Sequence, residues 1–174
     1  MKTELKRGKI SAAGMSFAVV VSRWNDEYTT QLAQGAIDGL LEYGADVTNI
    51  DTFWVSGAFE LPLASLKAAE SGGYDAVIAL GVVIRGDTPH FDYVACEASS
   101  GLMRASMESG VPVMFGVITA DTVEQVVVRC GEKADNKGYE AAVSAIETAA
   151  ALAEIAERAS ARREAGKERL LNVI

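Results

Sequence analysis

The sequence predicts an α/β fold, a three-layer open sheet of mainly parallel strands with a four-stranded core and helices on both faces. Short β-branched or apolar runs alternate four times with longer segments in which apolar residues repeat at helical spacing. One run, residues 76–84 (AVIALGVVI), is apolar almost throughout, as expected of a strand covered on both faces. Strand–helix alternation of this kind implies parallel strands joined by right-handed crossovers.

The elements are expected in the following order along the chain. The predicted strands are residues 16–23, 47–54, 76–84 and 111–118. The predicted helices are residues 27–43, 61–69, 91–108, 122–130 and 139–161. Gly44 lies where a glycine commonly ends a helix. The charged residues after the last helix are expected to be frayed or loosely docked.

The domain prediction is one N-terminal arm and one globular unit. Residues 1–15 have too little apolar periodicity to pack alone, so this arm is either disordered or laid against something else. Residues 16–174 are predicted to form a single α/β domain that ends in a charged C-terminal helix or tail. A chain of 174 residues is long enough for one such core.

Composition excludes several classes of function. The net charge of −8, from 24 acidic and 16 basic residues, argues against nucleic acid or an anionic membrane as the main partner. Cys96 and Cys130 form no CxxC pair, and the single histidine does not complete a zinc site with them. The first residues contain no apolar signal region, and no apolar run reaches the ~18 residues of a membrane span. These features predict a cytoplasmic protein.

Topology predicts where a ligand binds. In open α/β sheets, ligands bind outside the carboxyl ends of the strands. The segments expected there are residues 23–27, 56–60, 85–90 and 119–122. These segments contain most of the residues in the sequence that are candidates for binding a ligand or transferring protons.

The stretch RGDTPH, residues 85–90, is the most informative of these segments. Gly86 permits a tight turn, and the turn offers the amides of Asp87 and Thr88 and a hydroxyl to an anion. Thr88 can also cap the helix expected from Phe91. His90 is the only histidine, and a helix N-terminus favours the neutral imidazole, which can exchange protons near pH 7. A purely structural histidine remains an equal alternative on this pattern alone.

Three further patterns each allow a purely structural and a functional interpretation. Residues 55–64 (VSGAFELPLA) form either a polar ligand turn around Ser56 and Glu60 or an ordinary helix start. Trp24 either stacks on a planar heterocycle or packs at the sheet edge. Basic residues four apart form either a positive patch or a solvated surface, and the neighbouring glycines favour a broken helix there; these residues are Arg129, Lys133 and Lys137.

Five segments together resemble the lumazine synthase family. In chain order they are VVVSRWN, VSGAFELPLA, YDAVIALGVVIRGDTPHFDYV, GVPVMFGVIT and DTVEQ…R…NKGYEAA, and the resemblance runs from about Phe17 to Ala150. The third segment is the most specific, because it is long and lies at the expected distance from the others. The resemblance implies the flavodoxin-like form of the predicted α/β fold.

The resemblance also implies a reaction. The family condenses 5-amino-6-(D-ribitylamino)uracil with 3,4-dihydroxy-2-butanone 4-phosphate to 6,7-dimethyl-8-ribityllumazine, the penultimate step of riboflavin biosynthesis. Water and phosphate are released, and the family uses no metal and no organic cofactor. A transferase acting on two small-molecule substrates, one of them phosphorylated, is therefore expected.

Site residues follow from the resemblance and the patterns above. His90 matches the proton donor and acceptor. The residues expected to hold the ribitylaminouracil are Trp24, Ser56, Ala58, Phe59, Glu60, Val82, Val83, Ile84 and Phe115. Those expected to hold the butanone phosphate are Gly86, Asp87, Thr88, Arg129 and Lys137. A small neutral residue is common in the family where Asp87 stands, so we expect Asp87 to use its amide and turn its side chain away.

Assembly is implied in the same way. The family's minimum active unit is a homopentamer with sites between subunits, and Phe115 and Arg129 reach the site from a neighbour. Pentamers, decamers and icosahedral 60-subunit capsids all occur in the family. The N-terminal segment commonly adds a strand to a neighbour's sheet, which suits the arm at residues 1–15.

Two other functions remain open from the sequence. One is an archaeal-type riboflavin synthase, which dismutates two lumazines and needs no phosphate site. The other is a non-catalytic flavin- or lumazine-binding protein, or a shell-forming homologue. The presence of Arg129 together with the turn at residues 86–88 disfavours the first, and the retained His90, Arg129 and Glu60 disfavour the second.

Overall fold

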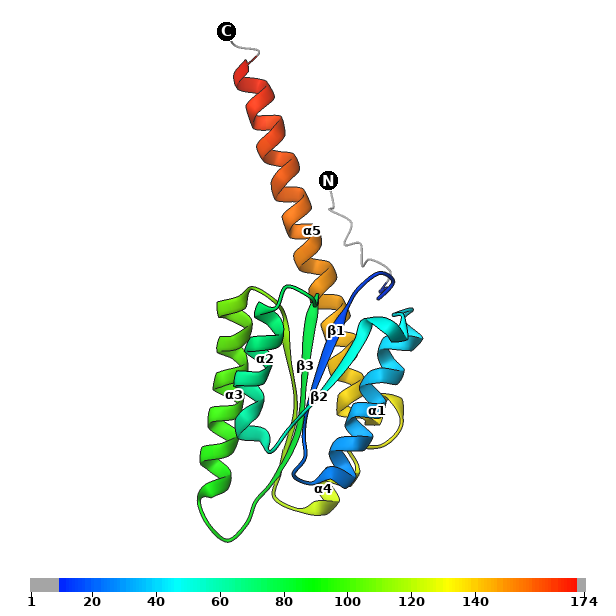
Figure 1. Ribbon diagram of the computed structural model, residues 1–174, viewed down its shortest axis with the longest axis vertical. Helices are drawn as coiled ribbons and strands as arrows, with labels where there is room; N and C mark the ends of the chain where they lie inside the picture. Colours follow the sequence, from blue (N-terminus) through cyan, green and yellow to red (C-terminus); the bar gives the residue numbers. More distant parts are fainter. Residues whose placement is uncertain (1–9, 172–174) are drawn as a thin grey trace, which may run out of the picture.

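Four parallel strands form the centre of the molecule (Figure 1). The computed structural model describes residues 10–171, except for the side chains of residue 134 and residues 166–171. The strands are β1 (Phe17–Ser22), β2 (Ile50–Val55), β3 (Ala76–Ile84) and β4 (Val113–Ala120), in the sheet order β2-β1-β3-β4. All three pairings are parallel. The predicted fold class is confirmed.

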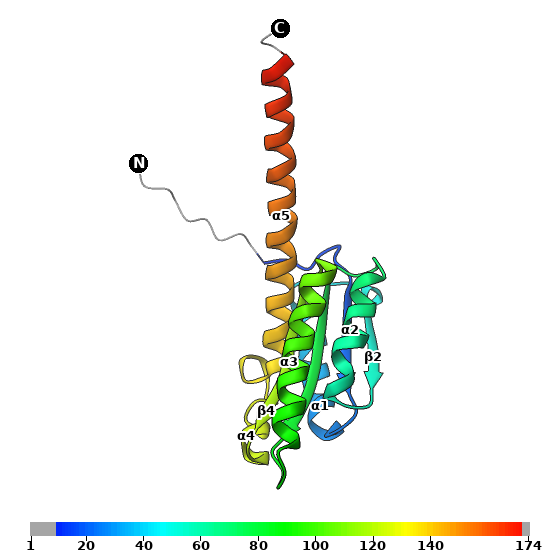
Figure 2. The same ribbon diagram turned by 90° about the vertical axis from the view of Figure 1, so that its left-hand side faces the viewer.

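Helices cover both faces of this sheet (Figures 1 and 2). They are α1 (Asp26–Glu42), α2 (Leu61–Glu70), α3 (His90–Ser109), α4 (Val123–Val127) and α5 (Lys137–Leu171). Three short 3₁₀ turns are η1 (Val47–Asn49), η2 (Ala58–Glu60) and η3 (Lys133–Asp135). Helices α2 and α3 lie on one face, and α1 and α5 lie on the other.

The core is divided in two by the sheet. Every residue of β1 is buried, and its side chains alternate between the two layers, as its position inside the sheet requires. Val19 and Val21 pack against α1 and α5, whereas Val20 packs against α2 and α3. The central strands therefore hold the helices of both layers in place against the sheet.

Helix α1 ends as its sequence predicts. Gly44 has φ +92°, in the left-handed region that favours glycine. Its N–H donates to the carbonyl of Leu41, and the N–H of Ala45 donates to that of Leu40. These two bonds form a Schellman motif, which satisfies the last carbonyls of the helix.

Two predicted helices are wrong in extent. Helix α4 contains only Val123–Val127, because the chain then folds back and Cys130 makes an antiparallel bridge with Asn136. Helix α5 begins at Lys137, where the Asn136 side chain caps it, and it continues to Leu171. Its distal part is rich in Ala, Glu and Arg, all strong helix formers, and includes an i,i+4 pair between Glu154 and Arg158.

The predicted frayed tail is therefore helical as far as Leu171, and it projects beyond the end of the sheet where the strands begin (Figures 1 and 2). Residues 172–174 lie outside the described part of the chain. So do residues 1–9 of the predicted N-terminal arm. Within that arm, Ala12 is fully buried and its N–H donates to the carbonyl of Tyr43 at 2.9 Å. Among the described residues, no helix is long and apolar enough to cross a membrane.

Candidate active site

Three loops gather at the carboxyl ends of the strands, where the topology predicts a ligand site. Trp24 and Asn25 follow β1, residues 56–60 follow β2, and residues 85–89 follow β3. Because the three strands are parallel neighbours, the loops that follow them meet at the carboxyl end of the sheet (Figure 1).

These loops enclose a cavity of about 640 Å³. This volume lies within the usual range for a small-molecule site. The cavity contains His90 and most of the residues predicted to bind the ribitylaminouracil. Its lining is Trp24, Asn25, Ser56, Gly57, Ala58, Phe59, Glu60, Val82, Val83, Ile84, Gly86, Thr88, His90, Phe91, Tyr93 and Val94.

Two aromatic side chains flank this cavity. Trp24 is 72% exposed and Phe59 is 58% exposed, so both rings present large apolar surfaces to the opening. Exposed apolar surface at the rim of a cavity is typical of a ligand-binding site. The predicted stacking position of Trp24 is thus compatible with its geometry, and within one chain the ring does not pack at the sheet edge.

Asn25 explains how Trp24 is held there. It has φ 62° and ψ 44°, a left-handed conformation that is uncommon outside glycine. Asn25 is the N-cap residue of α1, yet its side chain does not cap the helix. Nδ2 instead donates to the carbonyl of Val82 at 2.9 Å. The loop after β1 is therefore tied to β3 inside the cavity.

Glu60 closes the turn between β2 and α2. Its carboxylate accepts a hydrogen bond from the N–H of Gly57 at 2.8 Å. A ligand hydroxyl can still reach this side chain, because a carboxylate has several acceptor positions. The turn is thus both a helix start and a polar wall of the cavity.

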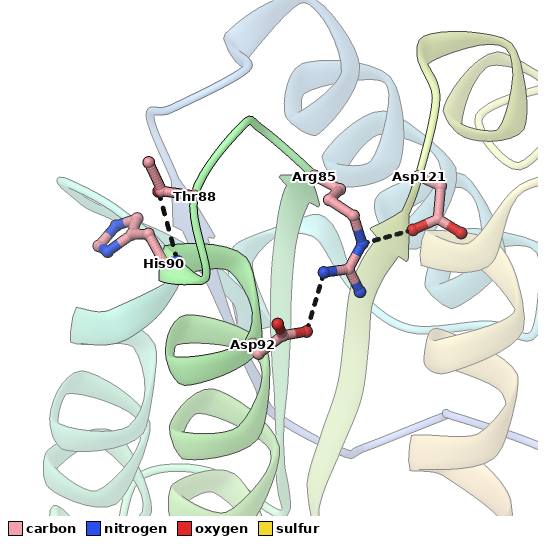
Figure 3. A network of polar contacts seen from close by, with 5 residues as sticks. All are labelled: Arg85, Thr88, His90, Asp92 and Asp121. Carbon is pink, nitrogen blue, oxygen red and sulfur yellow. Dashed lines mark hydrogen bonds and ion pairs between the residues drawn. The ribbon is translucent and has the colours of Figure 1, made fainter.

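His90 is the first residue of α3 and is exposed. Its backbone N–H reaches Oγ1 of Thr88 at 3.5 Å, the limit for a hydrogen bond, so the predicted cap by Thr88 is weak. Within the described part of the chain, neither ring nitrogen is hydrogen-bonded to a protein atom, and the ring points away from Arg85 and Asp92 (Figure 3). The imidazole is free to meet a ligand.

Three of the four remaining predicted residues lie in a second cavity of about 420 Å³ beside the edge strand β4. Phe115, Arg129 and Lys137 line it, and none of them lines the first cavity. Arg129 donates to the carbonyl of Gln125 at 2.6 Å, and Lys137 pairs with Glu140. Asp87 is exposed and lines neither cavity.

The three basic residues do not form one helical face. Arg129 follows α4, Lys133 lies in η3, and Lys137 begins α5. Lys133 pairs with Glu42 at 3.2 Å, away from the second cavity. The broken helix suggested by the glycines is therefore confirmed.

A comparison with protein families decides the relationship. The family model described as 6,7-dimethyl-8-ribityllumazine synthase matches residues 14–153. The chain belongs to this family. The match includes every residue that lines the two cavities, whereas the distal part of α5 lies beyond it.

Membership of the lumazine synthase family shows the coarse function. It implies a transferase-type enzyme of the riboflavin pathway that acts on two small-molecule substrates within an oligomeric assembly. Among the described residues, no three His, Cys, Asp or Glu side chains are placed to hold a metal ion.

Arg85 has no predicted role in the sequence, yet in the structure it makes two ion pairs beside the loop that carries His90 (Figure 3). Its Nε donates to Asp121 at 2.7 Å and its Nη1 donates to Asp92 at 3.0 Å. Hydrogen bonds to Asp121 and then Asp92 raise the pKa of the Arg85 guanidinium above its ordinary value. The available signal was an arginine at a strand's carboxyl end with an acidic residue seven positions later.

Cys130 is another side chain with a shifted pKa. Burial raises the pKa of its thiol to about 11, because desolvation disfavours the thiolate. A thiol with this pKa is protonated at neutral pH and is a poor nucleophile. Both cysteines are expected to be small buried hydrophobes, as free cysteines usually are. This is confirmed for Cys130 and wrong for Cys96, which is exposed.

Proposed function

We propose that this chain is a 6,7-dimethyl-8-ribityllumazine synthase. It condenses 5-amino-6-(D-ribitylamino)uracil with 3,4-dihydroxy-2-butanone 4-phosphate and releases water and phosphate, in the cytoplasm. The observation that carries the proposal is the position of His90. It stands in a cavity with an apolar aromatic rim and a glycine turn, in a chain that matches this family.

The ribitylaminouracil occupies the cavity of about 640 Å³. Trp24 stacks on its pyrimidine ring, since an exposed indole provides a large apolar face. Val82, Val83 and Ile84 contribute backbone groups from the end of β3. Further contacts come from Ser56, Ala58 and Phe59, and Glu60 accepts hydrogen bonds from the ribityl hydroxyls.

The butanone phosphate lies at the glycine turn after β3. Gly86 lets the backbone approach closely, and the amides of Asp87 and Thr88 point toward an anion. His90 transfers protons during imine formation, phosphate elimination and ring closure. Holding the two substrates in contact supplies much of the remaining rate enhancement.

Phe115, Arg129 and Lys137 belong in this proposal to a neighbouring subunit's site. They line a separate cavity beside the edge strand β4, so one chain does not surround both substrates with all the predicted groups. In a ring of subunits, the cavity beside β4 of each subunit faces the His90 cavity of the next subunit, so that every site is completed. We propose a homopentamer as this ring.

The direct test mixes the two substrates with the purified protein and follows lumazine absorbance and phosphate release together. The proposal predicts equal amounts of both products. An archaeal-type riboflavin synthase instead consumes lumazine and releases no phosphate. A non-catalytic binding protein forms neither product but still binds the lumazine.

Shared sites predict complementation between two inactive variants. His90→Ala subunits and Arg129→Met subunits are each expected to be nearly inactive alone. After denaturation and refolding together in equal amounts, about a quarter of the sites combine an intact His90 with an intact Arg129 from the neighbour. The recovered activity is measured against refolded wild type. If refolded mixtures gain nothing although mixed oligomers form, the sites lie within single subunits.

Asp87 is expected to matter little. Its side chain is exposed and does not line the first cavity, although its amide belongs to the glycine turn. Asp87→Asn should change the KM for butanone phosphate by less than about fivefold, the range of an exposed charge pair. Steady-state kinetics at two salt concentrations measure this effect. A large fall in KM for Asp87→Asn would show instead that the carboxylate faces the phosphate.

A further inference from the structure

The loop that carries His90 has little packing of its own. Every residue from 86 to 90 is exposed, and the only side-chain hydrogen bond within the loop is the long contact between Thr88 and the His90 N–H. A loop without buried side chains samples many conformations unless its ends are tied. His90 therefore depends on contacts at the two ends of this loop for its place over the cavity.

Arg85 makes such contacts at both ends (Figure 3). It is the residue directly after β3, and its Nη1 reaches the carboxylate of Asp92, in the first turn of α3, at 3.0 Å. This bond spans the loop from its first residue to the helix that follows it. Closing a short loop in this way removes most of its alternative conformations.

Two further hydrogen bonds tie Arg85 to the end of β4. The guanidinium Nε donates to Asp121, just after β4, at 2.7 Å. The backbone N–H of Arg85 donates to the carbonyl of Ala120 at 2.9 Å. The central carbon of the guanidinium lies 4.1 Å from the centre of the Phe91 ring. Phe91 follows His90 directly, so this cation–π contact also orients the first turn of α3.

These contacts disfavour two simpler interpretations of Arg85. It is not available as a phosphate ligand, because its fork already faces two carboxylates and the three groups together carry net negative charge. It also differs from an ordinary surface ion pair such as Lys67–Glu70, which joins two residues of one helix. Arg85 joins β3, α3 and the loop after β4 through one rigid planar group.

We propose that Arg85 is a positioning residue, which holds His90 over the cavity by clamping the loop between β3 and α3 to the end of β4. The proposal rests on the proposed synthase function, in which His90 transfers protons. Loss of the clamp should slow catalysis more than substrate binding, because small misplacement of a catalytic group lowers the rate strongly. The binding walls at Trp24 and Glu60 come from other loops and should be unaffected.

The first experiment compares Arg85→Met with Lys67→Met, which removes an exposed ion pair between two residues that do not line the cavity. For Arg85→Met we expect kcat to fall about 10- to 100-fold while KM for the ribitylaminouracil changes less than about threefold. Arg85→Lys keeps the charge but loses the fork and should be intermediate. Lys67→Met should leave both constants unchanged. A lowered melting temperature with unchanged kcat at 25 °C overturns the proposal, since it marks a merely structural residue.

The second experiment uses the fact that His90 is the only histidine in the chain. In untagged protein labelled with ¹³C-histidine, one imidazole signal reports its environment directly. Arg85→Met should shift or broaden that signal, and Lys67→Met should not. This readout needs no turnover, so it tests the clamp even if the wild-type protein fails to make lumazine and the proposed function falls. An unchanged signal in folded Arg85→Met refutes the clamp.

Should Arg85→Met not fold, Asp92→Asn and Asp121→Asn each remove one arm of the clamp. Asp92 closes the loop, so its variant should alter the His90 signal and kcat more than the Asp121 variant does. Combining Asp92→Asn with Arg85→Lys should add little beyond the larger single effect, because both changes break the same contact. Fully additive effects contradict a shared clamp.

Discussion

Replacing His90 with alanine is expected to lower kcat by about a hundred- to a thousandfold, the usual contribution of a general acid–base group. The loss should not be complete, because a site that binds two substrates in contact keeps the benefit of proximity. KM for the ribitylaminouracil should stay within a few fold, since Trp24, Phe59 and Glu60, which line the cavity where we propose that this substrate binds, are unchanged. Initial rates of lumazine formation measure both constants.

Added imidazole provides the control for this variant. A small molecule can enter the space left by the missing ring and restore part of the proton transfer, so imidazole should raise the rate of His90→Ala. It should do nothing for Lys67→Met, whose exposed ion pair lies on α2. Full activity of His90→Ala without imidazole would refute the role assigned to the histidine.

The fold could be predicted because its strongest signals are local. The buried strand β3 is apolar along its whole length, and the break at Gly44 needs only the conformation of one residue. The extents of α4 and α5 were less accessible. The bridge between Cys130 and Asn136 shortens the first of these helices, and no periodicity in the sequence reports such a contact. Helix α5 extends past its packed part through propensity and local pairs instead.

Much of the site could be placed by topology alone. Parallel strands bring Trp24, Glu60 and His90 to the same end of the sheet, although these residues are far apart in the sequence. Two features could not be found in this way. A single sequence does not say whether Arg129 lies at the cavity of His90, and in the structure it lines the separate cavity beside β4.

The second feature that could not be predicted is the set of contacts made by side chains distant in the sequence. Arg85 meets Asp121 across 36 positions, and Asn25 meets Val82 across 57. Nothing local in the sequence indicates either contact, because both depend on which loops become neighbours at the carboxyl end of the sheet.

Asn136 should be one of the most important residues for stability. It is almost fully buried, and its Nδ2 donates to the carbonyls of Gln31 and Gly131 at 3.0 and 2.9 Å. Its Oδ1 accepts from the N–H groups of Gly138 and Tyr139, which caps α5. Asn136→Ala loses this cap and both hydrogen bonds that Nδ2 donates, at a cost of about 3 kcal/mol. For a chain of this size, the melting temperature should fall by about 10 °C.

Asn49→Ala is the matched control, because Asn49 ends η1 and is only partly buried. It should change stability by less than about 0.5 kcal/mol. Both variants are compared with wild type at one protein concentration, since assembly makes melting temperatures depend on concentration. A melting temperature for Asn136→Ala within 2 °C of wild type, roughly the effect of 0.5–1 kcal/mol, contradicts the assigned role.

Activity at a temperature well below melting extends this test to the site. The loop that Asn136 closes has Arg129 at one end and Lys137 at the other, and the N–H of Lys137 donates to the carbonyl of Arg129 at 2.9 Å. If these two residues complete a neighbour's phosphate site, folded Asn136→Ala should show a raised KM for butanone phosphate. Its KM for the ribitylaminouracil should be unchanged, because the cavity at His90 is built from other loops. A uniform loss of both affinities would mean that Asn136 supports the fold alone.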